Sequence, residues 1–427
     1  MRHSDSDTDI AVTPAKMEAL LCDVQGINWL EFAPTTRDAF RAQRIASYRN
    51  YRNESIPHNE IYKDLHRGRT DASLYSFAYT LTRHPFKCSE YHFQLRNLLY
   101  STTNHSVYYS HNDQIRSWDS ITKTSKREMV APFRLSTISA RKEMLFMGAF
   151  TGEFCCKRID SDADSEVDVR TGVITNDAMG ITNHVELVDD RNGGPIAVIS
   201  SNDNKVRLMD MNRLQITNEF GFPWATNCSA LSPDKRLICV SGDHTDSSII
   251  SADSGDEVFT LKGHIDFSFA CAWSPCGRYV ATGNQDITTR VYDIRNPSKS
   301  LVVLPATMGA IRSLRFTDDG AFLAASEPCD FVHIYDFHGT TQNIPYTNSK
   351  LPLASKEQQK EPSVGPLGTD AFRSQTIDFF GEVAGISFTP EDGNMLYIGV
   401  SDHRYGSILE FERCRSRSDL FLRDVVL

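Results

Sequence analysis

The stretch GHIDFSFACAWSPCGRYVATGNQDITTRVYDIR, from Gly263 to Arg295, decides the fold of this chain. Its three short apolar runs are separated by a Ser-Pro-Cys-Gly turn and by Asn284-Gln285-Asp286, and none has the period of a helix. This pattern predicts three antiparallel strands in a meander. One such unit cannot bury both faces of its sheet, so we expect it to stack against copies of itself.

Copies of this unit recur along the chain. Strand ends with a terminal Asp lie at Asp119, Asp210, Asp253, Asp293 and Asp336, and the last four are 40 to 43 residues apart. A similar unit over FMGAFTGEFCCKRI fills the gap after the first end, and another follows residue 370. A period of about 40 to 45 residues is typical of the four-stranded blade of a propeller. The sequence thus predicts an all-β ring of seven blades.

The motifs also resemble a known family. Gly-His, Ser-Pro-x-Gly, a turn Asp and a terminal Tyr-Asp match the WD repeat, and the whole chain is similar to a fungal and plant group of WD-repeat proteins without a well-defined activity. The blocks that carry this likeness extend from Gln25 to Arg415 and read QGINW, GHIDFSFACAW, ATGNQD, GAIRSLRF, EPCDFVHIYD, IDFFGE and YGSILEFERCR. The resemblance implies a seven-bladed, transducin-like WD-repeat β-propeller with a short N-terminal helical extension.

The segments around the repeats define the domain organisation. Residues 1–16 are acidic and polar, so we expect them to be disordered. Residues 17–70 form the helical extension and 71–412 the propeller, with a flexible insertion at 340–370 between blades six and seven and a tail at 413–427. The run Ser73–Leu81 is expected to pair with the last blade and close the ring.

One helix of the extension is unusually basic. Thr35-Thr36 predicts its N-cap, and it is expected to continue to about Asn53. Its arginines are Arg37, Arg41, Arg44, Arg49 and Arg52, with aromatic residues between them. It either binds nucleic acid or an acidic partner, or docks its aromatic residues on the propeller while the arginines stay solvated or pair with acids there.

Composition narrows the function classes. The net charge of −10 disfavours non-specific binding to nucleic acid. The ten cysteines have no metal-ligand spacing, and the acidic run from Asp160 to Asp168 lacks the Gly and the Glu of an EF-hand loop, because Ser165 and Thr171 stand there. No secretory signal or membrane-spanning stretch is evident, so we expect a cytoplasmic or nuclear protein without cofactor or metal.

No catalytic template is present, which predicts that the protein is not an enzyme. His264, Thr282, Asp286 and Tyr292 resemble a hydrolase triad with an added phenol, but these positions match the structural tetrad of WD repeats. The resemblance implies a buried hydrogen-bond network that fixes the turns of the blade. In the sixth unit Cys329 stands where the turn Asp belongs, so its network is expected to be absent or rebuilt around Asp330.

Function is therefore expected on the rims of the ring. An aromatic and charged set is predicted to form a peptide-binding surface on the upper rim, and it consists of Trp224, Phe267, Gln285, Arg312, Glu327 and Glu382. The alternative for Phe267 and Trp224 is that they fold back into the core.

The main interpretation is a non-catalytic scaffold that binds partner proteins within a complex. A second hypothesis comes from Val280–Arg295, which resembles the DWD box by which WD-repeat substrate receptors engage the adaptor of cullin-RING ubiquitin ligases. Asp293 and Arg295 are the expected adaptor contacts, while Thr289 and the Tyr at 292 depart from that box. A third hypothesis is a chromatin or RNA-assembly subunit that uses the arginine-rich helix.

Overall fold

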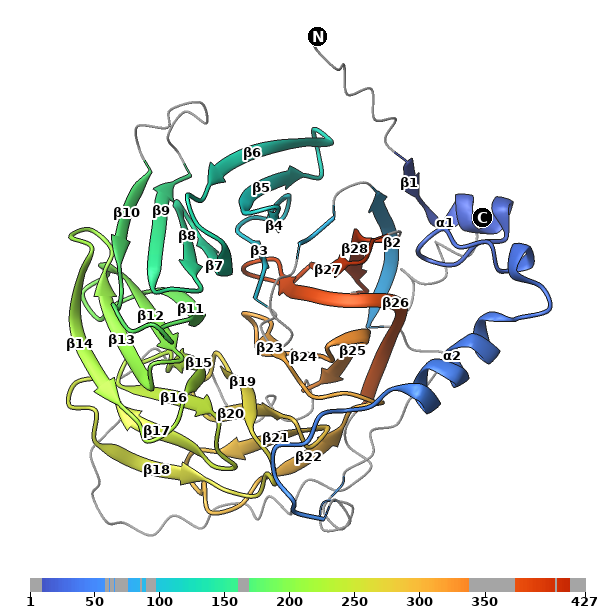
Figure 1. Ribbon diagram of the computed structural model, residues 1–427. Helices are drawn as coiled ribbons and strands as arrows, with labels where there is room; N and C mark the ends of the chain where they lie inside the picture. The colour runs from blue at the N-terminus through green and yellow to red at the C-terminus, as the bar shows by residue number, and fades with distance from the viewer. Residues whose placement is uncertain are drawn as a thin grey trace.

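The computed structural model describes residues 10–57, 61, 65, 76–84, 87–89, 97–159, 169–337, 373–403 and 405–414. These residues form antiparallel sheets arranged around a central axis, with the N-terminal segment on the outside (Figure 1). The acidic loop at 160–168, the insertion at 340–370 and most of the tail predicted from residue 413 lie outside the described residues. No described helix is long and apolar enough to span a membrane.

Five of the sheets have four strands each, connected in chain order. Their strands are β3 (Leu99–Ser101), β4 (Ser106–His111), β5 (Gln114–Asp119) and β6 (Thr124–Val130); β7 (Leu135–Arg141), β8 (Met144–Ala149), β9 (Glu153–Arg158) and β10 (Arg170–Val173); β11 (Thr182–Asp189), β12 (Pro195–Ser201), β13 (Lys205–Asp210) and β14 (Gln215–Gly221); β15 (Thr226–Leu231), β16 (Leu237–Gly242), β17 (Ser247–Ser251) and β18 (Glu257–Leu261); and β19 (Ser268–Trp273), β20 (Tyr279–Asn284), β21 (Thr288–Asp293) and β22 (Val302–Pro305).

The sixth sheet has eight strands in the order β1-β2-β28-β27-β26-β25-β24-β23. They are β1 (Ile10–Val12), β2 (Phe77–His84), β23 (Ser313–Phe316), β24 (Phe322–Ser326), β25 (Cys329–Asp336), β26 (Arg373–Phe388), β27 (Met395–Ser401) and β28 (Ser407–Arg413). The first part of β26 pairs with β25 and its last part with β27, so one long strand serves two repeats. Because this sheet is continuous, the count of seven blades stays a prediction.

Stacking of the sheets explains the burial of their strands. In β19 every residue is buried, because a neighbouring sheet covers each face. Val198 of one sheet and Leu231 of the next belong to a single apolar cluster, and Val291 and Leu323 share another across a later junction. The core is therefore a series of apolar layers between neighbouring sheets.

The closing strand predicted at Ser73–Leu81 is present as β2, although residues 73–75 are not described. It pairs antiparallel with β28, from Phe77 opposite Arg413 to Arg83 opposite Ile408. The ring therefore joins an N-terminal strand to the last strand of the chain, which leaves neither with an open edge on that side.

Two predictions for the N-terminal segment were wrong in part. Residues 10–16, expected to be disordered, form β1, which pairs with β2, and the start of α1 (Pro14–Leu20), capped by the Thr13 side chain. After η1 (Trp29–Phe32), a 3₁₀ helix, the basic helix α2 covers only Arg37–Ser47. It ends early because Tyr48–Asn53, called the strap below, is held in an extended course by the ring.

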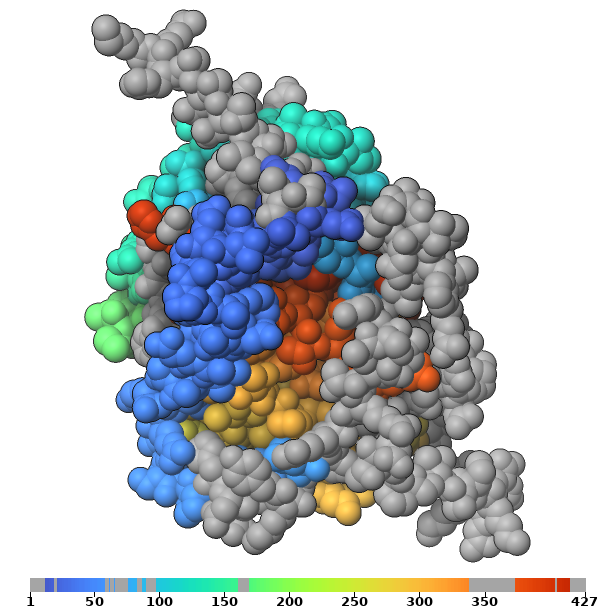
Figure 2. Space-filling model, turned by 90° about the vertical axis from the view of Figure 1, so that its right-hand side faces the viewer, coloured from blue at the N-terminus to red at the C-terminus, as the bar shows by residue number. Residues whose placement is uncertain are grey.

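The turns define two rims. The upper rim contains the β20–β21, β24–β25 and β27–β28 turns and the start of the inner strands, and the lower rim contains the β19–β20 and β21–β22 turns. Residues 10–57, called the extension, run from the edge of the eight-stranded sheet across its strands and on to the β19–β22 sheet, and Figure 2 shows them as a continuous blue band on the outside of the ring.

Candidate partner-binding surface

A large bulge in β26 creates the docking place of the extension. Between the pairs Phe331–Asp378 and Cys329–Glu382, three residues of β26 stand opposite Asp330 alone. The backbone groups of Phe379, Phe380 and Gly381 thus lack ladder partners, and buried backbone groups require others. Gly381 N donates to the Asp330 carboxylate at 2.9 Å.

The extension supplies partners for three of these backbone groups. The Gln25 amide donates to Phe380 O at 2.7 Å and accepts from Phe380 N at 2.5 Å, in the manner of a neighbouring strand. The Arg41 guanidinium donates to Phe379 O, and that of Arg37 donates to Asp378 O at 3.0 Å. Without the extension, these backbone groups of the bulge would lack hydrogen-bond partners. The side chains of the extension thus satisfy the backbone of the ring.

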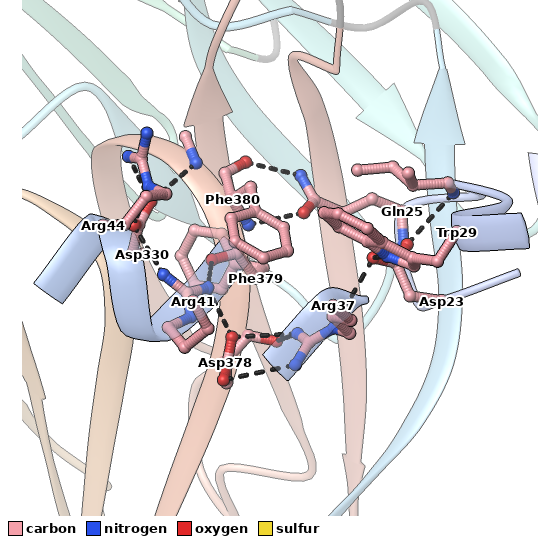
Figure 3. Close-up of polar contacts among 12 residues, drawn as sticks. Asp23, Gln25, Trp29, Arg37, Arg41, Arg44, Asp330, Asp378, Phe379 and Phe380 are labelled. Carbon is pink, nitrogen blue, oxygen red and sulfur yellow. Dashed lines mark hydrogen bonds and ion pairs between the residues drawn. The ribbon is translucent and has the colours of Figure 1, made fainter. Parts of the chain in front are cut away.

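Three arginines on one face of α2 pair with two acids of the ring (Figure 3). The spacing of four and three residues between Arg37, Arg41 and Arg44 aligns them along the helix. Arg41 bridges Asp330 and Asp378 at 2.6 and 2.5 Å, and Arg44 contacts Asp330 at 2.6 and 2.9 Å. The hydrogen bonds to Asp330 raise the pKa of Arg44. Of the two alternatives for the basic helix, docking on the propeller with ion pairs to its acids therefore applies to these three arginines.

Aromatic rings fill the space beside these ion pairs. Trp29 and Phe40 of the extension each contact Phe380, with ring centroids 5.2 Å apart in both cases. Arg41 lies over the same Phe380 ring at 4.0 Å, a cation–π distance. The junction is thus both apolar and ionic.

The strap crosses the upper rim and covers Gln285, which is fully buried. The Gln285 amide donates to Asn50 Oδ1 at 2.6 Å and to Tyr51 O at 2.8 Å, while Asn50 donates back to Gln285 O at 2.8 Å. Farther along, Asn53 makes two hydrogen bonds to the buried carboxylate of Asp266. An extended segment of this protein therefore already binds on the rim.

Three of the six predicted rim residues are consequently inaccessible. Gln285 is covered by the strap, and Arg312 lies beneath it, stacked on Phe269 at 3.7 Å and donating to Gln285 at 2.7 Å. Glu327 is fully buried, and its carboxylate accepts hydrogen bonds from the backbone of Thr307, Met308 and Gly309. For these three positions the prediction of an exposed binding surface was wrong.

The other three rim residues retain exposed surface. Trp224 is half-buried and contacts Phe222 and His244, with ring centroids at 4.8 and 6.2 Å. Phe267 is also half-buried, and Glu382 is exposed. Trp224 and Phe267 are thus neither fully buried in the core nor fully exposed on the rim.

The structure brings the tetrad residues together. His264 Nδ1 lies 2.8 Å from Asp286 Oδ2, and His264 Nε2 lies 2.9 Å from Thr282 Oγ1. The Tyr292 hydroxyl donates to Lys262 O at 3.0 Å. Burial opposes ionisation of Asp286, but its interactions with His264 and Thr288 lower the pKa of this carboxyl overall.

The unit with Cys329 in place of the turn Asp has a different network. Asp330 has a left-handed backbone, with φ of 72°, and its carboxylate faces the arginines of α2 rather than a histidine of its own sheet. His333 instead contacts Glu327 at 2.8 Å. Cys329, which stands at the turn position, is thus next to Asp330, the residue to which the arginines of the extension bind.

On the lower rim, Arg295 contacts Asp293 through Nε at 3.1 Å and Nη2 at 2.9 Å. Arg278 shares this carboxylate at 2.9 Å. Burial works against ionisation of Asp293, and hydrogen bonds from Arg295 and Arg278 lower its pKa overall. Asp293 thus holds Arg295 in a defined position, while 63% of the Arg295 side chain stays exposed.

A family model described as "WD domain, G-beta repeat" matches residues 255–293, the segment that contains the His264 network. This segment is a WD repeat. The chain is 24% identical over 357 residues to an uncharacterised protein of Schizosaccharomyces pombe, a match that covers 76% of this chain and 90% of that one. It is also 24% identical over 166 residues to a component of chromatin assembly factor 1 of Gallus gallus, covering 39% of this chain and 27% of that protein.

Comparison with solved structures agrees with the fold. A chain in the crystal structure of a mitotic checkpoint complex superposes with a TM-score of 0.61 at 14% identity, over 82% of this protein and 98% of that chain. WD-repeat propellers are generally non-catalytic and act as interaction scaffolds in complexes. Among the described residues, no group of three or more His, Cys, Asp and Glu side chains could hold a metal ion.

Proposed function

We propose that this protein is a non-catalytic scaffold that binds segments of partner proteins on the upper rim of its propeller. The observation that supports this most is the strap, an extended segment held by Gln285 and Asp266 through side-chain and backbone hydrogen bonds. Extended segments bind through such main-chain contacts, with specificity added by side-chain pockets. A rim that holds one such segment offers suitable geometry for a second one beside it.

Phe267 is the rim residue best suited to test this. It stands just before β19, next to the Asp266 that holds the strap, and its side chain is partly exposed. Aromatic residues with rigid neighbours are common hot spots of binding. The scaffold should therefore depend on Phe267 more than on residues of the lower rim.

The experiment compares proteins that co-purify with the wild type, with Phe267→Ala and with the lower-rim variant Arg295→Ala, quantified by mass spectrometry. We expect a defined set of partners to fall about tenfold or more with Phe267→Ala and to persist with Arg295→Ala. Equal recovery of every partner from both variants would reject the upper rim as the binding surface. Melting temperatures measured in parallel separate lost binding from lost folding.

A second candidate is a substrate receptor of a cullin-RING ubiquitin ligase. The observation in its favour is the exposed Arg295 guanidinium, held on the lower rim by Asp293. Purified ligase adaptor should bind the wild type and lose binding to Arg295→Ala, while Phe267→Ala binds normally. Absence of adaptor binding by the wild type, or equal binding by Arg295→Ala, would remove this candidate.

The docked arginines of α2 do not favour nucleic acid as a partner. Arg37, Arg41 and Arg44, the arginines that align along α2, donate to acids and carbonyls of the ring. A cationic face that is used within the protein is not free to neutralise phosphates.

A further inference from the structure

The extension and the ring enclose a groove on the upper rim, with a volume of about 690 Å³. Trp29, Phe32 and Phe40 form its wall on the side of the extension, and Phe380 and Tyr405 form the wall on the side of the ring. A concave site of this size that combines several aromatic side chains with a few polar groups is typical of ligand and peptide sites. Neither part of the chain makes this groove alone.

Apolar surface remains exposed at the groove. Phe32 is 42% exposed, and the nearby Leu30 is 66% exposed. Phe40 and Phe380 are more deeply placed and contact one another, with ring centroids 5.2 Å apart. The groove thus has the buried Phe380 and the half-buried Phe40 at its base and the exposed Phe32 at its edge, which suits the insertion of one large apolar side chain.

The charges of the groove favour a basic occupant. Glu382 and Asp402 are the carboxylates among its described lining residues, and Arg44 is the cation. Arg44 shares Asp330 with Arg41, and Arg37 and Arg41 pair with Asp378. Because Arg37 also contacts Asp23, these three arginines are balanced by three carboxylates of the protein itself. The net charge of −10 for the whole chain adds a long-range attraction for positive segments.

The protein itself binds such a segment beside the groove. In α2 the apolar Phe40 is followed by Arg41, and the pair inserts a ring against Phe380 and a guanidinium onto Asp378. An apolar residue next to an arginine is therefore a combination that this part of the ring accommodates.

We propose that the groove binds a partner-protein segment in which one large apolar side chain stands next to a lysine or arginine. The proposal rests on the scaffold function and adds the chemical class of its partner. The apolar side chain packs between Phe32 and Phe380, and the cation lies toward Glu382.

The test selects a library of displayed random peptides against the full-length protein. Bound peptides are compared between the wild type, Phe32→Ala, Glu382→Lys and a matched control, Ile121→Ser, whose exposed apolar side chain lies on another sheet. We expect the wild type and the control to enrich an apolar residue beside Lys or Arg. Affinity for the enriched peptides, measured by fluorescence anisotropy, should fall about tenfold with Phe32→Ala, and Glu382→Lys should favour acidic peptides instead.

Three results would overturn the proposal. The first is that the enriched peptides bind Phe32→Ala and Glu382→Lys as tightly as they bind the wild type. The second is that the enriched peptides carry Asp or Glu, rather than Lys or Arg, next to the apolar residue. Alternatively, light scattering finds a wild-type dimer that Phe32→Ala dissociates, which makes a second copy the occupant. If Phe267→Ala loses its partners while Phe32→Ala keeps them all and binds every peptide, the groove proposal fails and the scaffold function stands.

Discussion

Nη1 of Arg41 lies 2.6 Å from Oδ2 of Asp330, and the two side chains are only 8% and 0% exposed. This pair joins residue 41 of the extension to the bulge in the last sheet. Removing one partner of a buried ion pair leaves the other charge without compensation, which costs more than the pair itself contributes.

Arg41→Ala should therefore lower the free energy of unfolding by about 2–4 kcal/mol. The loss is limited because Asp330 keeps Arg44 and Gly381 N as partners. Chemical denaturation measures this loss. The matched control is Arg49→Ala on the exposed continuation of the same segment, expected within about 0.5 kcal/mol of wild type. Equal stability of the two variants would show that the extension adds nothing to the fold.

Asp286→Ala should destabilise the protein by about 1–3 kcal/mol and leave partner binding intact at a temperature where the variant is folded. The reason is that His264 and Thr288 lose their shared carboxylate in a buried network. Thermal unfolding and co-purification measured together check this. A variant with an unchanged melting temperature and abolished function would identify the network as a working site.

The same carboxyl predicts a pH dependence. Because the pKa of Asp286 is lowered by folding, its ionised form contributes stability above the unfolded value of about 3.9. That contribution is lost as the pH falls through the folded pKa. The difference in unfolding free energy between wild type and Asp286→Asn should shrink as the pH falls below about 4. A difference that grows on acidification would contradict the assigned sign.

Deletion of residues 343–369 should leave the fold intact. Asp336 and Arg373 are directly paired, so the ends that flank this segment are neighbours and a short connection can join them. Circular dichroism and the melting temperature of the deletion variant test this, with the wild type as reference. Loss of soluble protein would mean that the segment contributes to the last sheet.

The repeats made most of the fold predictable, because turn and strand signals lie within a few residues of one another. The contacts of His264 with Thr282 and Asp286 follow from the same local pattern. The number of blades was read from spacing alone, and the continuous strand β26 leaves that count open.

The covering of the rim could not be predicted from sequence. Gln285 and Arg312 occupy rim positions in the repeat pattern, but the strap that buries Gln285 is 235 residues away in the chain. The spacing of Arg37, Arg41 and Arg44 does reveal a basic helix face. Its partners Asp330 and Asp378 are two among 55 acidic residues. The atypical Cys329 draws attention to Asp330, but no local signal connects either acid to the basic helix.

Closure of the ring by β2 and docking of the extension also impose an order on synthesis. Gln25 and Phe380 are 355 residues apart, so at typical elongation rates the extension waits roughly 20–70 s before the bulge that binds it is translated. Until then its aromatic rings and arginines lack their docking site, and β2 has β1 on one side but not β28 on the other. The N-terminal segment is thus synthesised first but docks last. A chain whose synthesis stops before β28 cannot close the ring.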